Sequence, residues 1–218
     1  MLERSIRKLA LNDIERTIVV VGYRAAAIKK CLGHSFEGME IIYAENRDYA
    51  RTGSMYSLLA ARELIKEDVI LLESDILFER KAIDVVIRSK DKNVILVAAC
   101  RRIGDEVFIR TDRQGYLTDL GKAIPGKERA IGELVGISKL SLSFLHQMYH
   151  QAILRRDGKT LAYEDVILLT AKSGKADPVR CIFVKNLLWT DVDNVSDLKR
   201  AVEEISVKIR KKDRSDSF

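Results

Sequence analysis

The feature that most constrains the fold is the alternation of strand-like and helix-like segments along the first hundred residues. Residues 17–21 and 93–99 are continuous apolar runs, which are typical of strands buried on both faces of a sheet. Between such runs, apolar side chains recur at helical spacing, as in residues 54–65. This alternation predicts an α/β fold in which helices cover both faces of a mixed, mainly parallel sheet.

The second half of the chain departs from this alternation. Segments 106–110 and 116–120, joined by Asp112-Arg113-Gln114-Gly115, predict a β-hairpin. The extended segments that we expect are 17–21, 41–44, 68–72, 93–99, 131–139 and 180–184. The helices that we expect are 3–11, 24–32, 54–65, 80–87, 141–155, 164–171 and 195–209. With only two prolines and no low-complexity run, residues 1–209 should form one domain, followed by a basic, disordered tail at 210–218.

Composition excludes several classes of protein. No run approaches the roughly 20 apolar residues that span a bilayer, and the N-terminal segment has no signal-peptide pattern. Three cysteines, odd in number and set among apolar neighbours, predict reduced thiols in a cytoplasmic protein. The net charge is +6, but part of it lies in residues 208–214 and no nucleic-acid-binding motif accompanies it. We therefore expect neither a membrane nor a nucleic acid as partner.

Two strand-like runs end abruptly in carboxylates. Leu71-Leu72 is followed by Glu73-Ser74-Asp75, and the run that ends in Trp189-Thr190 is followed by Asp191-Val192-Asp193-Asn194. Ligands bind at the carboxyl ends of strands in open α/β sheets, so these carboxylates can meet around one divalent cation. Mg²⁺ commonly takes one or two carboxylates together with substrate phosphates, which indicates phosphate chemistry. A simpler interpretation is that Asp75 begins a turn and that Asp193 or Asn194 caps a helix.

Four motifs in register resemble one family. They are Met55-Tyr56-Ser57-Leu58, Gly104-Asp105-Glu106-Val107, Gly132-Glu133-Leu134-Val135-Gly136-Ile137-Ser138 and Leu188-Trp189-Thr190-Asp191-Val192-Asp193-Asn194. In this order they resemble the small-molecule nucleotidyltransferases, and most of all the cytidylyltransferases that act on phosphocholine or 2-aminoethylphosphonate. The resemblance runs from residue 1 to about Leu198. It implies a Rossmann-like, GT-A-like three-layer fold with a β-hairpin elaboration.

The resemblance also implies a reaction, the transfer of CMP from CTP to a small phosphonate or phosphate with release of pyrophosphate. The family's Mg²⁺ carboxylates correspond to Asp75 and Asp193, with Asp191 or Glu73 in support. The family's catalytic lysine corresponds most nearly to Lys122, although its neighbours here, Gly121 and Ala123, depart from the family motif. In the alternative enzyme hypothesis, the acceptor is a sugar 1-phosphate.

Other residues are candidates for binding the two substrates. An acceptor that carries an ammonium group would need carboxylates or an aromatic face near its cation. The candidates for that role are Asp105, Glu106, Glu133, Tyr163, Glu164, Asp165 and Trp189. Ser54 and Ser57 could bind the cytosine or ribose of CTP. In the simpler interpretation, the acids lie on solvated faces, Trp189 belongs to the core and the serines cap a helix.

The start of the sequence departs from the family. Members open with a strand, a Gly-rich loop that carries an arginine, and a downstream Pro-Lys pair, whereas this sequence begins at the helix that follows. We therefore expect an N-terminally incomplete domain, from a misassigned start or from a truncated copy, and a homodimer as one way to shield the gap. A hypothesis of another class follows, in which the chain is a catalytically inactive binding or scaffold protein.

Overall fold

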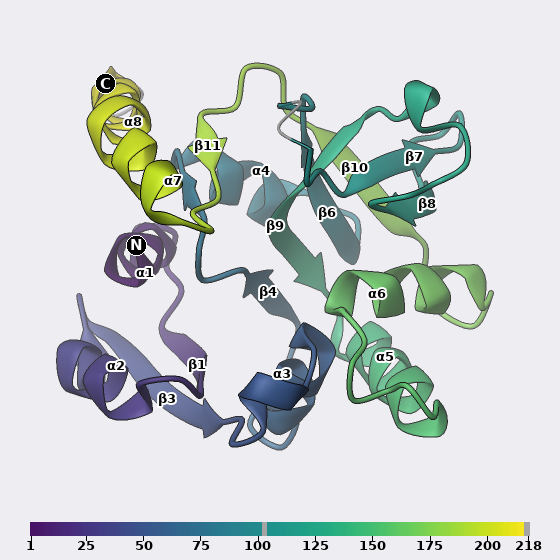
Figure 1. Ribbon diagram of the computed structural model, residues 1–218, viewed down its shortest axis with the longest axis horizontal. Helices are drawn as coiled ribbons and strands as arrows, with labels where there is room; N and C mark the ends of the chain where they lie inside the picture. The colour runs from purple at the N-terminus through teal and green to yellow at the C-terminus, as the bar shows by residue number, and fades with distance from the viewer. Residues whose placement is uncertain (102–103, 216–218) are drawn as a thin grey trace.

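The strands form three sheets in the computed structural model, which describes residues 1–101 and 104–215 (Figure 1). The first sheet has the order β1 (Arg16–Val21), β3 (Met39–Glu45), β2 (Ser35–Phe36). The second has the order β10 (Val179–Phe183), β6 (Asn93–Ala98), β9 (Gly132–Leu140), β7 (Phe108–Thr111), β8 (Leu117–Gly121), and β4 (Val69–Leu72) also pairs with β9. The third joins β11 (Trp189–Thr190) to β5 (Leu77–Phe78).

The two large sheets mix parallel and antiparallel pairs. β1 runs parallel to β3, and β6 runs parallel to β10. β9 runs antiparallel to β4, β6 and β7. β7 and β8 form the hairpin that the sequence predicts. The predicted α/β fold with a mixed sheet and a hairpin is therefore confirmed. The sheets are not mainly parallel as expected, because β9 runs antiparallel to all three of its neighbours.

The strands β1 and β4 belong to one layer although they are in different sheets. One apolar cluster, here the first core cluster, takes Ile18, Val20, Val69 and Leu71. The second core cluster takes the alternate side chains Val19, Val21, Ile70 and Leu72. Arg16 also forms an ion pair with Glu67, so the two strands begin near each other. Among the described residues no backbone pairing joins β1 to β4, and the layer is interrupted between them.

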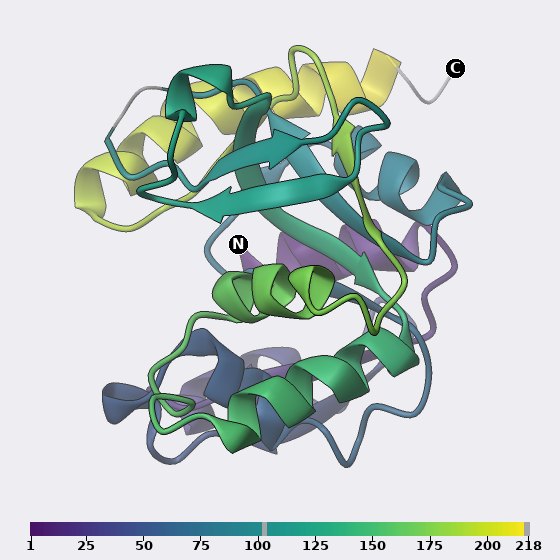
Figure 2. The ribbon, with the colours of Figure 1, turned by 90° about the vertical axis from the view of Figure 1, so that its right-hand side faces the viewer.

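Helices cover both faces of this layer. The first core cluster includes side chains of α3 (Ser54–Ala60), α5 (Leu142–Leu154) and α6 (Tyr163–Lys172). The second includes side chains of α1 (Leu2–Ala10), α2 (Ala25–Leu32) and α4 (Lys81–Arg88). In Figure 2, α5 and α6 lie in front of the sheet and α1 lies behind it. Short 3₁₀ turns occur at η1 (Tyr49–Arg51) and η2 (Lys127–Arg129).

The predicted closing helix extends further than expected. It consists of α7 (Val195–Arg200), a π-helical turn (Ala201–Ile205) and α8 (Ser206–Ser215), with the side chain of Asn194 as N-cap. Residues 210–215, which we expected in a disordered tail, form the end of α8, and 216–218 lie outside the described residues. The physical reason is docking of α8. Lys212 pairs with the buried Glu79 at 2.7 Å, and Asp213 accepts a hydrogen bond from the Arg80 amide at 2.8 Å.

Helix α3 is shorter than predicted. It ends at Ala60, and its N-cap is Gly53, so Ser54 does not cap it. Gly53 lies so close to the segment before α6 that a Cβ atom there would be 2.2 Å from the carbonyl oxygen of Leu161. In the part of the chain that the structure describes, no helix has the length and apolar character needed to cross a membrane.

Candidate active site

Carboxylates that follow the ends of three strands lie close together. Asp75 follows β4, Asp105 lies in the loop after β6, and Asp191 and Asp193 follow β11. One carboxylate oxygen from each of Asp105, Asp191 and Asp193 lies within 4.8 Å of the others. Asp75 is close enough to Asp191 for their charges to repel. The structure thus brings together the three residues that we expected to bind metal, and it adds Asp105, which we had placed with the acceptor.

The cluster has the properties of a cation site. The Oδ1 atoms of Asp75 and Asp105 are buried and have no hydrogen-bond partner among the described residues. Burial and repulsion by Asp191 raise the pKa of Asp75. Burial, followed by repulsion from Asp191, Asp75 and Asp105, also raises the pKa of Asp193. A bound divalent cation would relieve both effects, and a set of carboxylate oxygens suits Mg²⁺.

Arg101 is a site residue that sequence reasoning missed. Its Nη1 and Nη2 donate to the two oxygens of Asp191 at 2.6 and 2.7 Å. Its Nε and backbone N–H donate to Oε1 of Glu133 at 2.8 and 3.0 Å. Its guanidinium carbon also lies 4.1 Å from the ring centroid of Trp189. Glu133 and Trp189, both candidates for the acceptor site, are therefore already bound to a cation of the protein itself.

Glu73 and Tyr163 form a second buried pair. The hydroxyl of Tyr163 donates to Oε1 of Glu73 at 2.7 Å. The Glu73 side chain lies against Gly136, which lies in β9 between the residues that pair with β7 and those that pair with β4. A Cβ atom on Gly136 would be 2.3 Å from Oε2 of Glu73. Burial, only partly opposed by the Tyr163 hydrogen bond, raises the pKa of Glu73 to about 7. Tyr163 is thus held at the edge of the carboxylate cluster.

The remaining acceptor candidates differ in their surroundings. Glu106 is buried and accepts a hydrogen bond from the Gly104 amide at 3.2 Å. Glu164 lies near Lys122, an exposed residue after β8 whose charge partly offsets the burial that raises the pKa of Glu164. Asp165 is exposed at the start of α6. Lys122 is therefore near the acidic set, while Asp165 faces solvent.

Ser54 and Ser57, which we expected at the nucleotide, are engaged with protein groups. Oγ of Ser54 accepts from the Tyr163 amide at 2.9 Å. Oγ of Ser57 accepts from the side chain of Asn46 at 3.0 Å. The buried Asn46 amide also donates to Thr52 at 3.0 Å and so closes the loop before α3. Both serines thus order the N-terminal end of α3 in this state.

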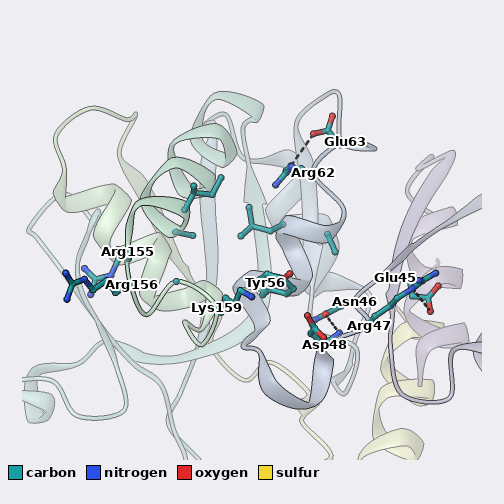
Figure 3. Close-up of a pocket in the computed structure, with 15 residues that line it drawn as sticks. Glu45, Asn46, Arg47, Asp48, Tyr56, Arg62, Glu63, Arg155, Arg156 and Lys159 are labelled. Carbon is teal, nitrogen blue, oxygen red and sulfur yellow. Dashed lines mark hydrogen bonds and ion pairs between the residues drawn. The ribbon is translucent and has the colours of Figure 1, made fainter.

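A pocket of about 670 Å³ lies elsewhere (Figure 3). It is lined by the loop after β3, by α3 and by residues 152–159, and none of the predicted site residues lines it. Several of its cations pair with acids next to them, as Arg62 does with Glu63 at 3.1 Å and Arg155 with Asp157 at 2.9 Å. We therefore place the chemistry at the carboxylate cluster and not in this pocket.

The sequence matches a family model and resembles a curated protein. A domain family of unknown function, DUF6564, matches residues 1–102. A CMP-5'-(3-aminopropyl)phosphonate synthase from Streptomyces rubellomurinus is 25% identical over 207 residues, which cover 92% of this chain and 33% of that protein. The chain thus spans about a third of the length of the curated relative that it matches.

Solved structures agree in fold. The inositol-1-phosphate CTP transferase from T. maritima superposes with a TM-score of 0.72 at 20% identity, over 96% of this chain and 83% of that one. A protein from Bacillus anthracis designated a glucose-1-phosphate thymidylyltransferase gives a TM-score of 0.75 at 15% identity, over 92% and 80% of the two chains. The resemblance that the four motifs predict is confirmed, and the chain has the fold of the small-molecule nucleotidyltransferases.

Proposed function

We propose that the chain is a nucleotidyltransferase domain that transfers CMP from CTP to a small phosphonate or phosphate and releases pyrophosphate. The observation that carries the proposal is the meeting of Asp75, Asp105, Asp191 and Asp193 at the ends of three strands. Nucleotidyl transfer needs alignment and charge neutralisation more than it needs covalent chemistry from the protein. A carboxylate cluster at the carboxyl edge of the sheet suits that need.

In the proposed reaction, an anionic oxygen of the acceptor attacks the α-phosphorus of CTP. The new P–O bond forms as the bond from the α-phosphorus to the bridging oxygen breaks, and pyrophosphate leaves with the electron pair. The acceptor is already ionised, so no side chain has to remove a proton. Mg²⁺, held by the carboxylate cluster, would neutralise the charge that develops on the phosphate oxygens. Lys122 would offset negative charge at the acceptor.

The acceptor that we favour carries an ammonium group, as in 2-aminoethylphosphonate or phosphocholine. The support is the part of the acidic and aromatic set that Arg101 does not already bind, in which Glu164 lies near Tyr163. The curated relative's name, an aminopropylphosphonate synthase, supports the same choice. The names of the two structural neighbours, which include inositol 1-phosphate and glucose 1-phosphate, support a sugar 1-phosphate as the second candidate.

The test is pyrophosphate release with CTP and Mg²⁺, with 2-aminoethylphosphonate, phosphocholine or glucose 1-phosphate as acceptor. We expect turnover with CTP and an acceptor that carries an ammonium group. Asp193→Asn should lower the rate by about 100-fold or more, because it removes a carboxylate of the cluster. Asp177→Asn is the matched control, since Asp177 is an exposed acid that pairs with Lys92 at 2.9 Å.

Other results would change or contradict the proposed function. Turnover only with glucose 1-phosphate would favour the second candidate. CTP binding without pyrophosphate release from folded protein, with every acceptor, would contradict the enzyme and leave a nucleotide-binding protein. An equal loss of activity in both variants would show that the carboxylate cluster has no special role.

A further inference from the structure

Arg101 holds three parts of the candidate site together. It lies in the loop after β6, its guanidinium binds Asp191 after β11, and its Nε binds Glu133 in β9. Only 17% of the Arg101 side chain is exposed. Burial opposes its charge, but hydrogen bonds to Asp191 and Glu133 outweigh burial and raise its pKa. Arg101 is therefore a permanent cation inside an acidic site.

This arrangement makes the hydrogen bonding of Asp191 different from that of the other carboxylates of the cluster. Both oxygens of Asp191 are hydrogen-bonded to the guanidinium in bidentate geometry. By contrast, Oδ1 of Asp75 and Oδ1 of Asp105 are buried and have no partner among the described residues. The unused capacity to bind a cation thus belongs to Asp75 and Asp105, and the exposed Asp193 lies beside Asp105.

We propose that Arg101 is a positioning residue that keeps Asp191 out of the metal's ligand set, so that Asp105 and Asp193, whose carboxylate oxygens lie within 4.8 Å of each other, bind the divalent cation. This inference rests on the proposed function. The physical reason is charge balance. Two carboxylates suffice for one Mg²⁺ that also binds substrate phosphates, and the charge of Asp191 is already neutralised by the guanidinium, which makes it a weak ligand. The same contact fixes the segment between Trp189 and Asp193.

The structure provides a direct readout of this site. Trp189 is the single tryptophan of the chain, and the Arg101 guanidinium stacks on it. Tryptophan fluorescence therefore reports on Arg101 and on a cation bound beside Asp193. Mn²⁺ is a suitable probe, because it prefers the same oxygen ligands as Mg²⁺ and it quenches fluorescence when it binds nearby.

The experiment compares Mn²⁺ affinity, measured by fluorescence quenching and by calorimetry, between wild type and variants. Arg101→Met removes the competing positive charge and frees Asp191, so we expect Mn²⁺ to bind about tenfold more tightly. The double variant Arg101→Met with Asp191→Asn removes the whole ion pair, and we expect its affinity to stay within about threefold of wild type. A loss of structure alone would weaken Mn²⁺ binding and would not tighten it.

Arg180→Met is the matched control. Arg180 also stacks on an aromatic ring, that of Tyr116 at 4.0 Å, and pairs with Asp91 at 3.2 Å, but neither partner belongs to the carboxylate cluster. We expect this variant to bind Mn²⁺ as wild type does.

Three results would overturn the inference. Unchanged or weaker Mn²⁺ binding by Arg101→Met is the first. The second is a loss of Mn²⁺ affinity of more than about tenfold in the double variant, which would make Asp191 a direct ligand. This affinity can still be measured if the single variant does not fold. The third is no Mn²⁺ binding by wild type, which would remove the metal from the proposed function as well. In the first two results wild type still binds, so only the role of Arg101 fails.

Discussion

The surroundings of the buried residue Glu73 raise the pKa of its carboxyl group. It accepts a hydrogen bond from Tyr163 at 2.7 Å and lies against Gly136, whose φ of +81° suits glycine. Its pKa rises from 4.5 to about 7 because burial disfavours the charged form, and repulsion by Asp75, Glu164 and Asp191 adds to the effect. An acid of this kind should make the stability of the protein depend on pH.

We predict that Glu73→Gln stabilises the metal-free protein at high pH. The folded state binds the Glu73 proton more tightly than the unfolded state, so this contribution is fully present below pH 4.5 and is lost as the pH rises through about 7. The amide of Gln cannot ionise and can still accept from Tyr163. The variant should therefore exceed wild type in free energy of unfolding by about 3 kcal/mol at pH 8 and by less than about 1 kcal/mol at pH 5.

Urea unfolding in the presence of a chelator, measured from pH 5 to pH 8.5, checks this prediction. Glu128→Gln serves as the control, because that side chain is 71% exposed. A difference between Glu73→Gln and wild type that does not change with pH would mean that Glu73 is not buried as the structure describes.

At the scale of elements, the start of α3 is joined to the segment that leads into α6. The Gly53 amide donates to the Lys159 carbonyl at 2.8 Å, and the Met55 amide donates to the Leu161 carbonyl at 3.2 Å. In return, the Tyr163 amide donates to Oγ of Ser54 at 2.9 Å. This junction places Tyr163 at Glu73. It also explains why position 53 is a glycine, since a side chain would collide with the backbone of Leu161.

We predict that Gly53→Ala destabilises the protein by about 3 kcal/mol, because the new Cβ would lie 2.2 Å from the Leu161 carbonyl oxygen and the junction would have to open. Gly174→Ala is the matched control. Its φ of +67° disfavours alanine, but nothing lies within 4 Å of the added atom. It should cost only about 1 kcal/mol. Thermal and urea unfolding measure both values, and equal costs would show that the two segments are not in contact at Gly53.

At the scale of the whole molecule, the sheet layer is continuous in its packing but interrupted in its hydrogen bonding. The side chains of β1 and β4 alternate between the same two core clusters, yet no backbone pairing joins the two strands among the described residues. In contrast, β6 lies between β9 and β10, and all six of its residues are buried. The amides of these strands should therefore differ in protection from solvent.

We predict alternating amide hydrogen exchange along β1 and β4. In each strand, successive amides point to opposite edges, so every second amide should exchange fast because its edge is unpaired. The amides of β6, which is paired on both edges except where its pairing with β9 is interrupted at Leu96, should exchange slowly. Exchange measured by NMR at single-residue level tests this. Uniform slow exchange in β1 and β4 would mean that another strand covers their free edges in solution.

The sequence by itself determined the elements and their classes, because those depend on local periodicity. The apolar runs of β1 and β6 and the hairpin turn at Asp112 were readable, and the cap of the closing helix was narrowed to Asp193 or Asn194. The strand-end positions of Asp75 and Asp193 were readable as well. The end of α3 at Ala60 and the folding of residues 210–215 into α8 were not, because contacts with distant segments decide both.

Only the tertiary structure decided how the charged groups of the site pair. Nothing near Arg101 in the sequence indicates that it binds Asp191, 90 positions away, and Glu133, 32 positions away. The same holds for Tyr163 and Glu73. Periodicity places a residue on a strand end or a helix face, whereas ion pairing depends on which strand ends the folded sheet brings within about 3 Å of each other. The convergence of Asp75, Asp191 and Asp193 was therefore predictable from the strand ends, whereas the position of Asp105 beside them and the pairing of Asp191 with Arg101 were not.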